Sequence, residues 1–223
     1  MQCRIALQTE RLTMEDLKLK YVYIDRQHAC VDGVMLEHES QGGAMLSELY
    51  RAHIGDWPKF FKMDTLSKVG FLASDLLLKA LGREKPGEEY TSDCAVVLFG
   101  ATASLCADRN YQETIQDADN YYPSPALFVY TLPNIVTGEI AIRNRFRGET
   151  SFYVVEKADA AQMAFHLACA FDDDVTAGVL AGWVDSRHND DFQAFFTMVT
   201  RDDAKDTDRL AAAIQTIMDN SNI

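Results

Sequence analysis

The stretch TSFYVVEKADAAQMAFHLACAF, from Thr150 to Phe171, decides the fold. An apolar run of strand type, Phe152 to Val155, is followed by a short polar turn and then by a helix with apolar residues at helical spacing. A nucleophile on such a turn would lie at a helix N-terminus, where unpaired N–H groups and the helix dipole favour an anion. Lys157 stands there instead, and its positive charge cannot use that site. The segment therefore predicts a catalytic fold without its nucleophile.

Composition and charge narrow the class of protein. The 223 residues include 21 Lys and Arg against 34 Asp and Glu, a net charge of −13, which argues against binding to nucleic acid or to an anionic membrane. The start, MQCRIALQTERL, lacks the apolar core of a signal peptide, and no apolar run reaches the ~20 residues of a membrane span. We therefore expect a cytoplasmic protein without membrane or nucleic-acid partners.

The five cysteines are odd in number, widely spaced and without a C-x-x-C pair. This pattern does not fit a zinc site or a thioredoxin-type redox site, and it favours a reduced protein with mostly buried thiols. We expect no metal and no cofactor.

Strand-type and helix-type segments alternate along the chain, which predicts an α/β fold with a mostly parallel central sheet and helices on both faces. We expect a single domain over residues 1–223. Besides the segment at Thr150, the expected strands are Tyr21–Ile24, His28–Met35, Cys94–Gly100, Thr176–Val184 and Phe192–Thr200, and the expected helices are Ala44–His53, Leu66–Leu81 ended by Gly82, Arg109–Asn120 and Asp208–Met218.

Five segments in register resemble the N-terminal half of the β-ketoacyl synthases, which have the thiolase-like fold. They are Lys62-Met63-Asp64 with Ser67, then Val96–Gly100, then Pro125 with Thr131–Asn134, Gly138, Ile140 and Ala141, then Gly148 before the turn, and finally Gly178–Gly182. The match runs from residue 60 to residue 186. The resemblance implies one thiolase-like half, that is, a layered α-β-α domain.

The departures from the family pattern carry the functional prediction. Aligned on Gly148, the family's nucleophilic cysteine falls at Lys157, with Glu156 before it. Cys169 lies too far along the following helix, on or near its packed face, to replace it. The family's catalytic histidines and lysine belong to a C-terminal half that this sequence does not show. The chain thus resembles the short ketosynthase-like subunits and chain-length factors without a catalytic cysteine that pair with full ketosynthases in type II polyketide systems, including those for aryl polyenes.

The resemblance implies a non-catalytic subunit of fatty-acid or polyketide synthesis that forms a dimer with a full-length ketosynthase and meets the acyl carrier protein only indirectly. The strand before the turn would pair with the partner: Ser151, Phe152, Tyr153, Val154 and Val155. A proline at Tyr153 is predicted to break this pairing and to leave the isolated fold intact. A second segment would shape the partner's acyl pocket: Ala126, Leu127, Phe128, Val129, Tyr130 and Thr131. The alternative is an acyltransferase that acts alone through a residue other than cysteine.

Other residue patterns have a structural and a chemical interpretation. His166 and Cys169, three apart on one helix, fit core packing, or else a Cys–His pair or two metal ligands. Asp172 to Asp174 fit a solvated helix end better than a metal site, because consecutive carboxylates cannot all face one ion. The segment Phe99–Ser104 follows a strand but lacks the glycines and lysine of a phosphate loop.

Two further features leave alternatives open. Lys157 and Glu156 fit a surface ion pair, whereas a buried Lys157 would fit a Schiff-base nucleophile. The aromatic pairs Phe60-Phe61 and Tyr121-Tyr122 fit core and loop anchors, or else a partner interface.

Overall fold

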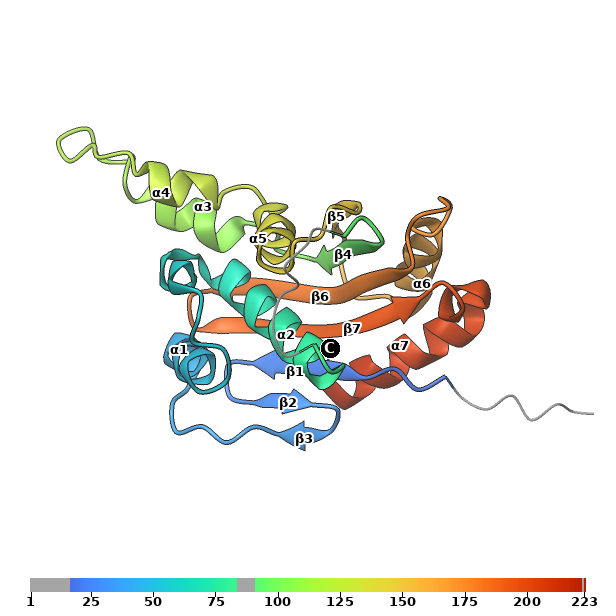
Figure 1. Cartoon of the computed structure of the whole chain (residues 1–223). Helices are drawn as coiled ribbons and strands as arrows, with labels where there is room; N and C mark the ends of the chain where they lie inside the picture. The colour runs from blue at the N-terminus through green and yellow to red at the C-terminus, as the bar shows by residue number, and fades with distance from the viewer. Residues whose placement is uncertain (1–16, 84–90, 222) are drawn as a thin grey trace, which may run out of the picture.

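The computed structural model describes residues 17–83, 91–221 and 223 (Figure 1). The strands are β1 (Tyr21–Asp25), β2 (Ala29–Val31), β3 (Val34–Met35), β4 (Cys94–Gly100), β5 (Thr150–Val154), β6 (Gly178–His188) and β7 (Asp191–Thr200). The helices are α1 (Gly42–His53), α2 (Thr65–Ala80), α3 (Leu105–Gln112), α4 (Pro125–Val129), α5 (Ile135–Asn144), α6 (Ala160–Cys169) and α7 (Thr207–Ser221), with short 3-10 helices η1 (Pro58–Lys62) and η2 (Asp203–Lys205).

All seven strands form one mixed sheet in the order β3-β2-β1-β7-β6-β4-β5. The α/β class is confirmed, but the expectation of a mostly parallel sheet holds only around β4, which runs parallel to β5 and β6. The other pairings are antiparallel. For β2–β3 and β6–β7 the reason is local, because each pair is joined by a two-residue turn, which permits only antiparallel pairing. In the first turn Asp32 and Gly33 both take positive φ, 51° and 83°.

Strand β4, between β6 and the edge strand β5, is buried along its whole length, as its apolar sequence predicts. Gly148, which precedes β5, passes so close to this strand that a Cβ there would lie 2.3 Å from the carbonyl oxygen of Cys94. A side chain at this position would push the two chains apart, so the glycine sets the approach of β5 to β4.

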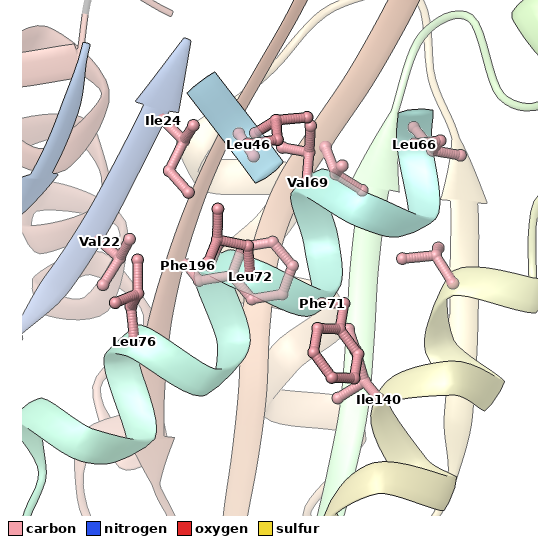
Figure 2. Close-up of a cluster of buried hydrophobic side chains, with 14 of the residues drawn as sticks. Val22, Ile24, Leu46, Leu66, Val69, Phe71, Leu72, Leu76, Ile140 and Phe196 are labelled. Carbon is pink, nitrogen blue, oxygen red and sulfur yellow. The ribbon is translucent and has the colours of Figure 1, made fainter. Parts of the chain in front are cut away.

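One face of the sheet is covered by α1, α2 and α5. Figure 2 shows the stripe of Val69, Leu72 and Leu76 on α2 facing Phe196 of β7 and the β1 side chains. Asp64 caps the start of α2 by accepting the N–H of Ser67 at 3.0 Å, which gives the Lys-Met-Asp…Ser pattern its physical reason.

The predicted stop of α2 at Gly82 is also observed. Gly82 has φ +88°, its N–H donates to Lys79, and the N–H of Arg83 donates to the carbonyl of Leu78, which together form a Schellman motif.

The opposite face of the sheet is covered by α6 and α7. On α6 the predicted core positions Ala160, Met163, Ala164 and Leu167 are buried against the strands. A layer of helices on each face matches the predicted α-β-α arrangement.

Two segments depart from what the sequence analysis expects. The polar helix expected to reach Asn120 ends at Gln112 and continues as turns. Residues 135–144, which received no assignment from the sequence, form α5. Most of the loop predicted after Gly82 lies outside the described residues. In the described part of the chain, no helix is long and apolar enough to cross a membrane.

Candidate functional site

The predicted strand–turn–helix segment is present as β5, a bend and α6. Along β5 the side chains alternate: Phe152 packs toward the α2 and α5 layer, and Tyr153 and Val155 pack toward α6 and α7. The N–H of Val155 donates to the carbonyl of Gly100 at 3.0 Å, which is the last bond between this segment and β4. The chain then bends before α6 starts.

Lys157 lies on this bend and is exposed, as is Glu156. The helix N-cap is Asp159, two residues later, and its carboxylate accepts the N–H of Gln162 at 2.9 Å. Lys157 therefore precedes the first turn of α6 instead of occupying it, which corrects the sequence-based placement at the helix terminus. Because the amine is open to solvent, nothing desolvates it toward Schiff-base chemistry. In the described residues no ion pair joins Lys157 to Glu156 either.

His166 and Cys169 do not form a chemical pair. The imidazole of His166 is half-buried and stacks on Tyr153, with ring centroids 4.3 Å apart, and Tyr153 in turn stacks on Phe99 at 5.2 Å. Cys169 is exposed, so the expectation that it packs in the core is wrong, because α6 turns that position away from the sheet. Across residues 17–83, 91–221 and 223, no three His, Cys, Asp or Glu side chains are grouped to hold a metal ion.

β5 forms one edge of the sheet, and no described strand pairs with its outer side. The carbonyl of Glu149 and the N–H of Val155 both bond to β4. Because successive residues of a strand direct their N–H and C=O groups to opposite sides, the groups of Phe152 and Val154 point to the open edge. An unpaired edge of this kind is a template for strand addition.

Exposed apolar side chains lie beside this edge in both helical layers. Val154 on β5 is 57% exposed, Ile142 on the adjoining α5 is 59% exposed, and Phe165 on α6 is 60% exposed. The ring of Phe165 lies edge-on to His166 at 5.4 Å, and His166 covers Tyr153. The edge therefore presents an unpaired backbone flanked by apolar surface above and below the sheet.

The second predicted segment, Ala126 to Thr131, lies mostly on α4, which projects with α3 from the body of the molecule (Figure 1). Every side chain of α4 is apolar, and within this fully described helix none is buried. Phe128, 56% exposed, touches Tyr111 of α3. The structure thus does not bring this segment together with β5, and it leaves α4 as a separate exposed apolar surface.

The base of this projection is held by polar contacts. The Tyr130 hydroxyl lies 3.3 Å from Glu139 Oε1, which also accepts Lys59 Nζ at 2.7 Å, and Ser104 Oγ donates to the carbonyl of Thr131 at 2.8 Å. Burial, together with the Glu139 carboxylate, raises the pKa of Tyr130, so the phenol stays protonated and donates to Glu139. These contacts fix where α4 leaves the body.

Sequence reasoning missed the charged residues of α5. Arg143 is buried, with Nε 2.9 Å from Asp75 and a terminal nitrogen 2.6 Å from Asp56, and its guanidinium lies 5.5 Å from the Trp57 ring. The ion pairs join α5 to α2 and to the loop before η1. The signal was that Glu139 and Arg143 lie four residues apart among apolar residues, which is visible only once residues 135–144 are recognised as a helix.

The remaining candidates have structural roles. Asp173 accepts three hydrogen bonds from Val175 and Thr176 in a surface turn, as the solvated interpretation predicts. In the loop after β4, Thr102 donates from both N–H and hydroxyl to the Asp185 carboxylate at 2.8 and 2.5 Å, and that negative charge disfavours a phosphate.

The aromatic pairs divide between core and surface. Phe60 is buried and stacks on Tyr50 at 4.1 Å, so the core interpretation holds for it. Phe61, Tyr121 and Tyr122 are exposed and do not anchor the core.

No family model and no curated protein sequence matches the chain. Several solved structures, in contrast, match the fold of this chain. The ishigamide ketosynthase/chain length factor superimposes with a TM-score of 0.59 at 14% identity, covering 82% of this chain and 61% of that one. The chain thus spans less than two thirds of that relative's length. The likeness shows the thiolase-like ketosynthase fold, which confirms the predicted fold.

Two further solved structures match less closely. The ketosynthase ApeO in complex with its chain length factor ApeC, from Xenorhabdus doucetiae, gives a TM-score of 0.48 at 14% identity over 82% of this chain and 79% of that one. The AntDE:AntF complex of a type II polyketide acyl-carrier protein with its ketosynthase gives 0.48 at 12% identity over 84% and 64%.

Proposed function

We propose that this chain is a non-catalytic ketosynthase-like subunit that pairs with a full-length β-ketoacyl synthase and shapes the partner's acyl pocket. The partner would catalyse chain extension in fatty-acid or polyketide synthesis of the aryl-polyene type. The ishigamide protein, which shares the fold, combines a ketosynthase with a chain length factor.

The observation that carries the proposal is the open edge of β5 leading into a bend that bears Lys157 in place of a thiol. An unpaired strand between exposed apolar side chains favours association with another sheet. A lysine that is exposed at the bend lacks the buried setting that activates an amine as a nucleophile, so it does not take over the role of a cysteine thiolate. Association without chemistry is therefore the role that fits this segment.

The exposed helix α4 supports the second half of the proposal. Five apolar residues without burial are unfavourable in water, and a partner's acyl pocket would cover them. Since Tyr130 and Thr131 are fastened to the body, α4 would be presented to the partner in a fixed position.

The alternative, an acyltransferase acting alone, needs an activated nucleophile. Burial raises the pKa of the Cys94 thiol to about 11 and also raises the pKa of Cys106, so neither is poised as a thiolate. Cys169 is exposed, and within the described part of the chain no hydrogen bond joins it to His166, whose ring stacks on Tyr153. Cys94, Cys106 and Cys169 thus do not supply such a nucleophile.

The test of inactivity is intact-mass spectrometry after incubation with acyl-CoA and with acyl-loaded carrier protein. We expect no stoichiometric adduct, and Cys169→Ser separates adventitious thiol labelling from catalysis. A stoichiometric adduct that survives Cys169→Ser would overturn the non-catalytic assignment.

The test of partnership is co-expression with a full-length β-ketoacyl synthase, followed by co-purification. We expect a stable one-to-one complex, and the comparison variant is Val154→Pro, which alters only the open edge. A ketosynthase that purifies with the Val154→Pro variant as well as with wild type would contradict pairing at β5.

A further inference from the structure

The projection formed by α3 and α4 leaves the body of the molecule and returns to it at one place (Figure 1). Its two ends meet where Ser104 Oγ, at the start of α3, donates to the carbonyl of Thr131, just after α4, at 2.8 Å. Farther out, the rings of Tyr111 on α3 and Phe128 on α4 lie 5.4 Å apart. The position of α4 therefore depends on what holds each of the two helices to the body.

The two helices are held in different ways. On α3, Cys106 is buried, and Cys106 Sγ and Asn110 Nδ2 both donate to Asn189 Oδ1 in the turn between β6 and β7, at 3.3 and 3.1 Å. On α4, by contrast, no side chain is buried within this fully described helix. A helix of five residues is too short to be stable by itself. Its hydrogen bonds therefore depend on Tyr130, the buried residue at its C-terminal end.

Tyr130 is held through an ion pair. Its hydroxyl and Lys59 Nζ both contact Glu139 Oε1, at 3.3 and 2.7 Å. The Glu139 side chain is 4% exposed, and its other oxygen, Oε2, has no hydrogen-bond partner among the described residues. A buried carboxylate is costly unless a cation lies against it. The Lys59 ammonium therefore offsets the cost of burying the acceptor that Tyr130 uses.

Lys59 connects this ion pair to the core and to solvent at once. It lies on η1 beside Phe60, which is fully buried and stacks on Tyr50 at 4.1 Å, so its backbone is fixed. The Lys59 side chain itself is 48% exposed. An ion pair with one solvated member is weakened by dissolved salt. Water and ions can therefore compete with Glu139 for Lys59.

We infer that the Lys59–Glu139 ion pair is a latch that holds α4. With the pair closed, Tyr130 and α4 keep one position; with the pair open, α4 loses its hydrogen bonds while α3 keeps its contacts with the β6–β7 turn. Lys59 and Glu139 are positioning residues, because they act on α4 through Tyr130. The inference concerns the isolated chain and stands whether or not its partner is a ketosynthase.

Hydrogen–deuterium exchange of the purified full chain tests the latch. In α4 and just after it, the backbone N–H groups of Leu127, Phe128, Tyr130 and Thr131 are hydrogen-bonded, so their exchange reports opening. Lys59→Gln should speed this exchange by about ten- to a hundredfold, because a charge-assisted bond is lost, and should leave the amides of β6 unchanged. Lys59→Arg, which keeps the charge, should behave as wild type.

The matched control is Lys62→Gln, because Lys62 is exposed on the same turn and, within residues 17–83, 91–221 and 223, forms no ion pair. This control should leave α4 as in wild type. Unchanged exchange of α4 in Lys59→Gln, or equal acceleration in Lys62→Gln or in β6, would overturn the inference.

Two measurements distinguish an ionic latch from simple packing. Because Lys59 and Tyr130 act on one carboxylate, Tyr130→Phe should speed exchange of α4 less in the Lys59→Gln background than alone, and full additivity would refute the latch. Raising NaCl from about 0.05 M to about 1 M should speed exchange of α4 in wild type but not in Lys59→Gln. Circular dichroism checks each fold. If Lys59→Gln does not fold, the wild-type salt response decides: exchange of α4 that ignores salt would contradict the inference.

Discussion

Proline substitutions on β5 distinguish the role of its open edge in association from its contribution to the stability of the fold. Val154→Pro removes an N–H that points to the open side, on a side chain that is already 57% exposed. No bond to β4 is lost, and Tyr153 before it keeps the extended conformation that a following proline favours. The free energy of unfolding should therefore change by less than about 1 kcal/mol.

The same substitution should cost far more in association. Pairing of β5 with the proposed ketosynthase partner would lose one cross-strand hydrogen bond, worth about 1 kcal/mol net, and would leave an opposing carbonyl unpaired at a further 1–3 kcal/mol. The sum of about 2–4 kcal/mol corresponds to a roughly 30- to 700-fold weaker Kd. Sedimentation equilibrium of this chain mixed with the ketosynthase partner measures the change in Kd.

Tyr153→Pro is the matched comparison, and here the structure revises the expectation from sequence. The Tyr153 N–H points inward to β4, and its ring stacks on Phe99 and His166. Losing that bond and those contacts should lower the free energy of unfolding by about 2–5 kcal/mol, measured by urea denaturation. If Val154→Pro destabilised the fold as much as Tyr153→Pro, or left association unchanged, the assignment of inward and outward groups on β5 would be refuted.

Four further outcomes follow from single sites. Lys157→Cys should yield a thiol that iodoacetamide labels but no condensation of malonyl units, and condensation by the variant alone would contradict the non-catalytic assignment. Gly100→Ala should lower the urea midpoint and cost about 1–3 kcal/mol of the free energy of unfolding, because its Cβ would lie 2.4 Å from a backbone carbonyl of β6. Gly138→Ala on α5 should raise the free energy of unfolding by up to about 1 kcal/mol, because nothing lies within 4 Å of its Cβ. Hydrogen bonds from the Thr176 backbone and side chain lower the pKa of Asp173, so the stabilisation by this carboxylate is complete above the ordinary aspartate pKa and is lost as pH falls through the lowered value. The free energy of unfolding of Asp173→Ala should therefore equal that of wild type only in acid. A difference that stays constant at every pH would count against this pKa shift.

Local patterns in the sequence were sufficient for several elements. The buried run Cys94–Gly100 predicted β4, the apolar stripe and Gly82 predicted α2 with its C-terminal stop, and the run from Phe152 predicted the strand–turn–helix segment. These features depend on residues within a few positions of one another, so periodicity and capping chemistry are enough to reveal them. The absence of a cysteine at Lys157 is likewise a property of the sequence alone.

Other features depended on residues far apart in the chain. The direction of each strand, the position of β5 at an open edge and the exposure of Cys169 follow from which strands pair and which helix face meets the sheet. The Arg143 ion pairs join residues 68 and 87 positions apart. The spacing of apolar residues indicates which face of a helix or strand is buried, but it does not indicate which other element packs against that face. Only the tertiary structure could show that Phe152 and Val154 turn their backbone groups to solvent while Tyr153 turns its own to β4, because that depends on the register between β4 and β5.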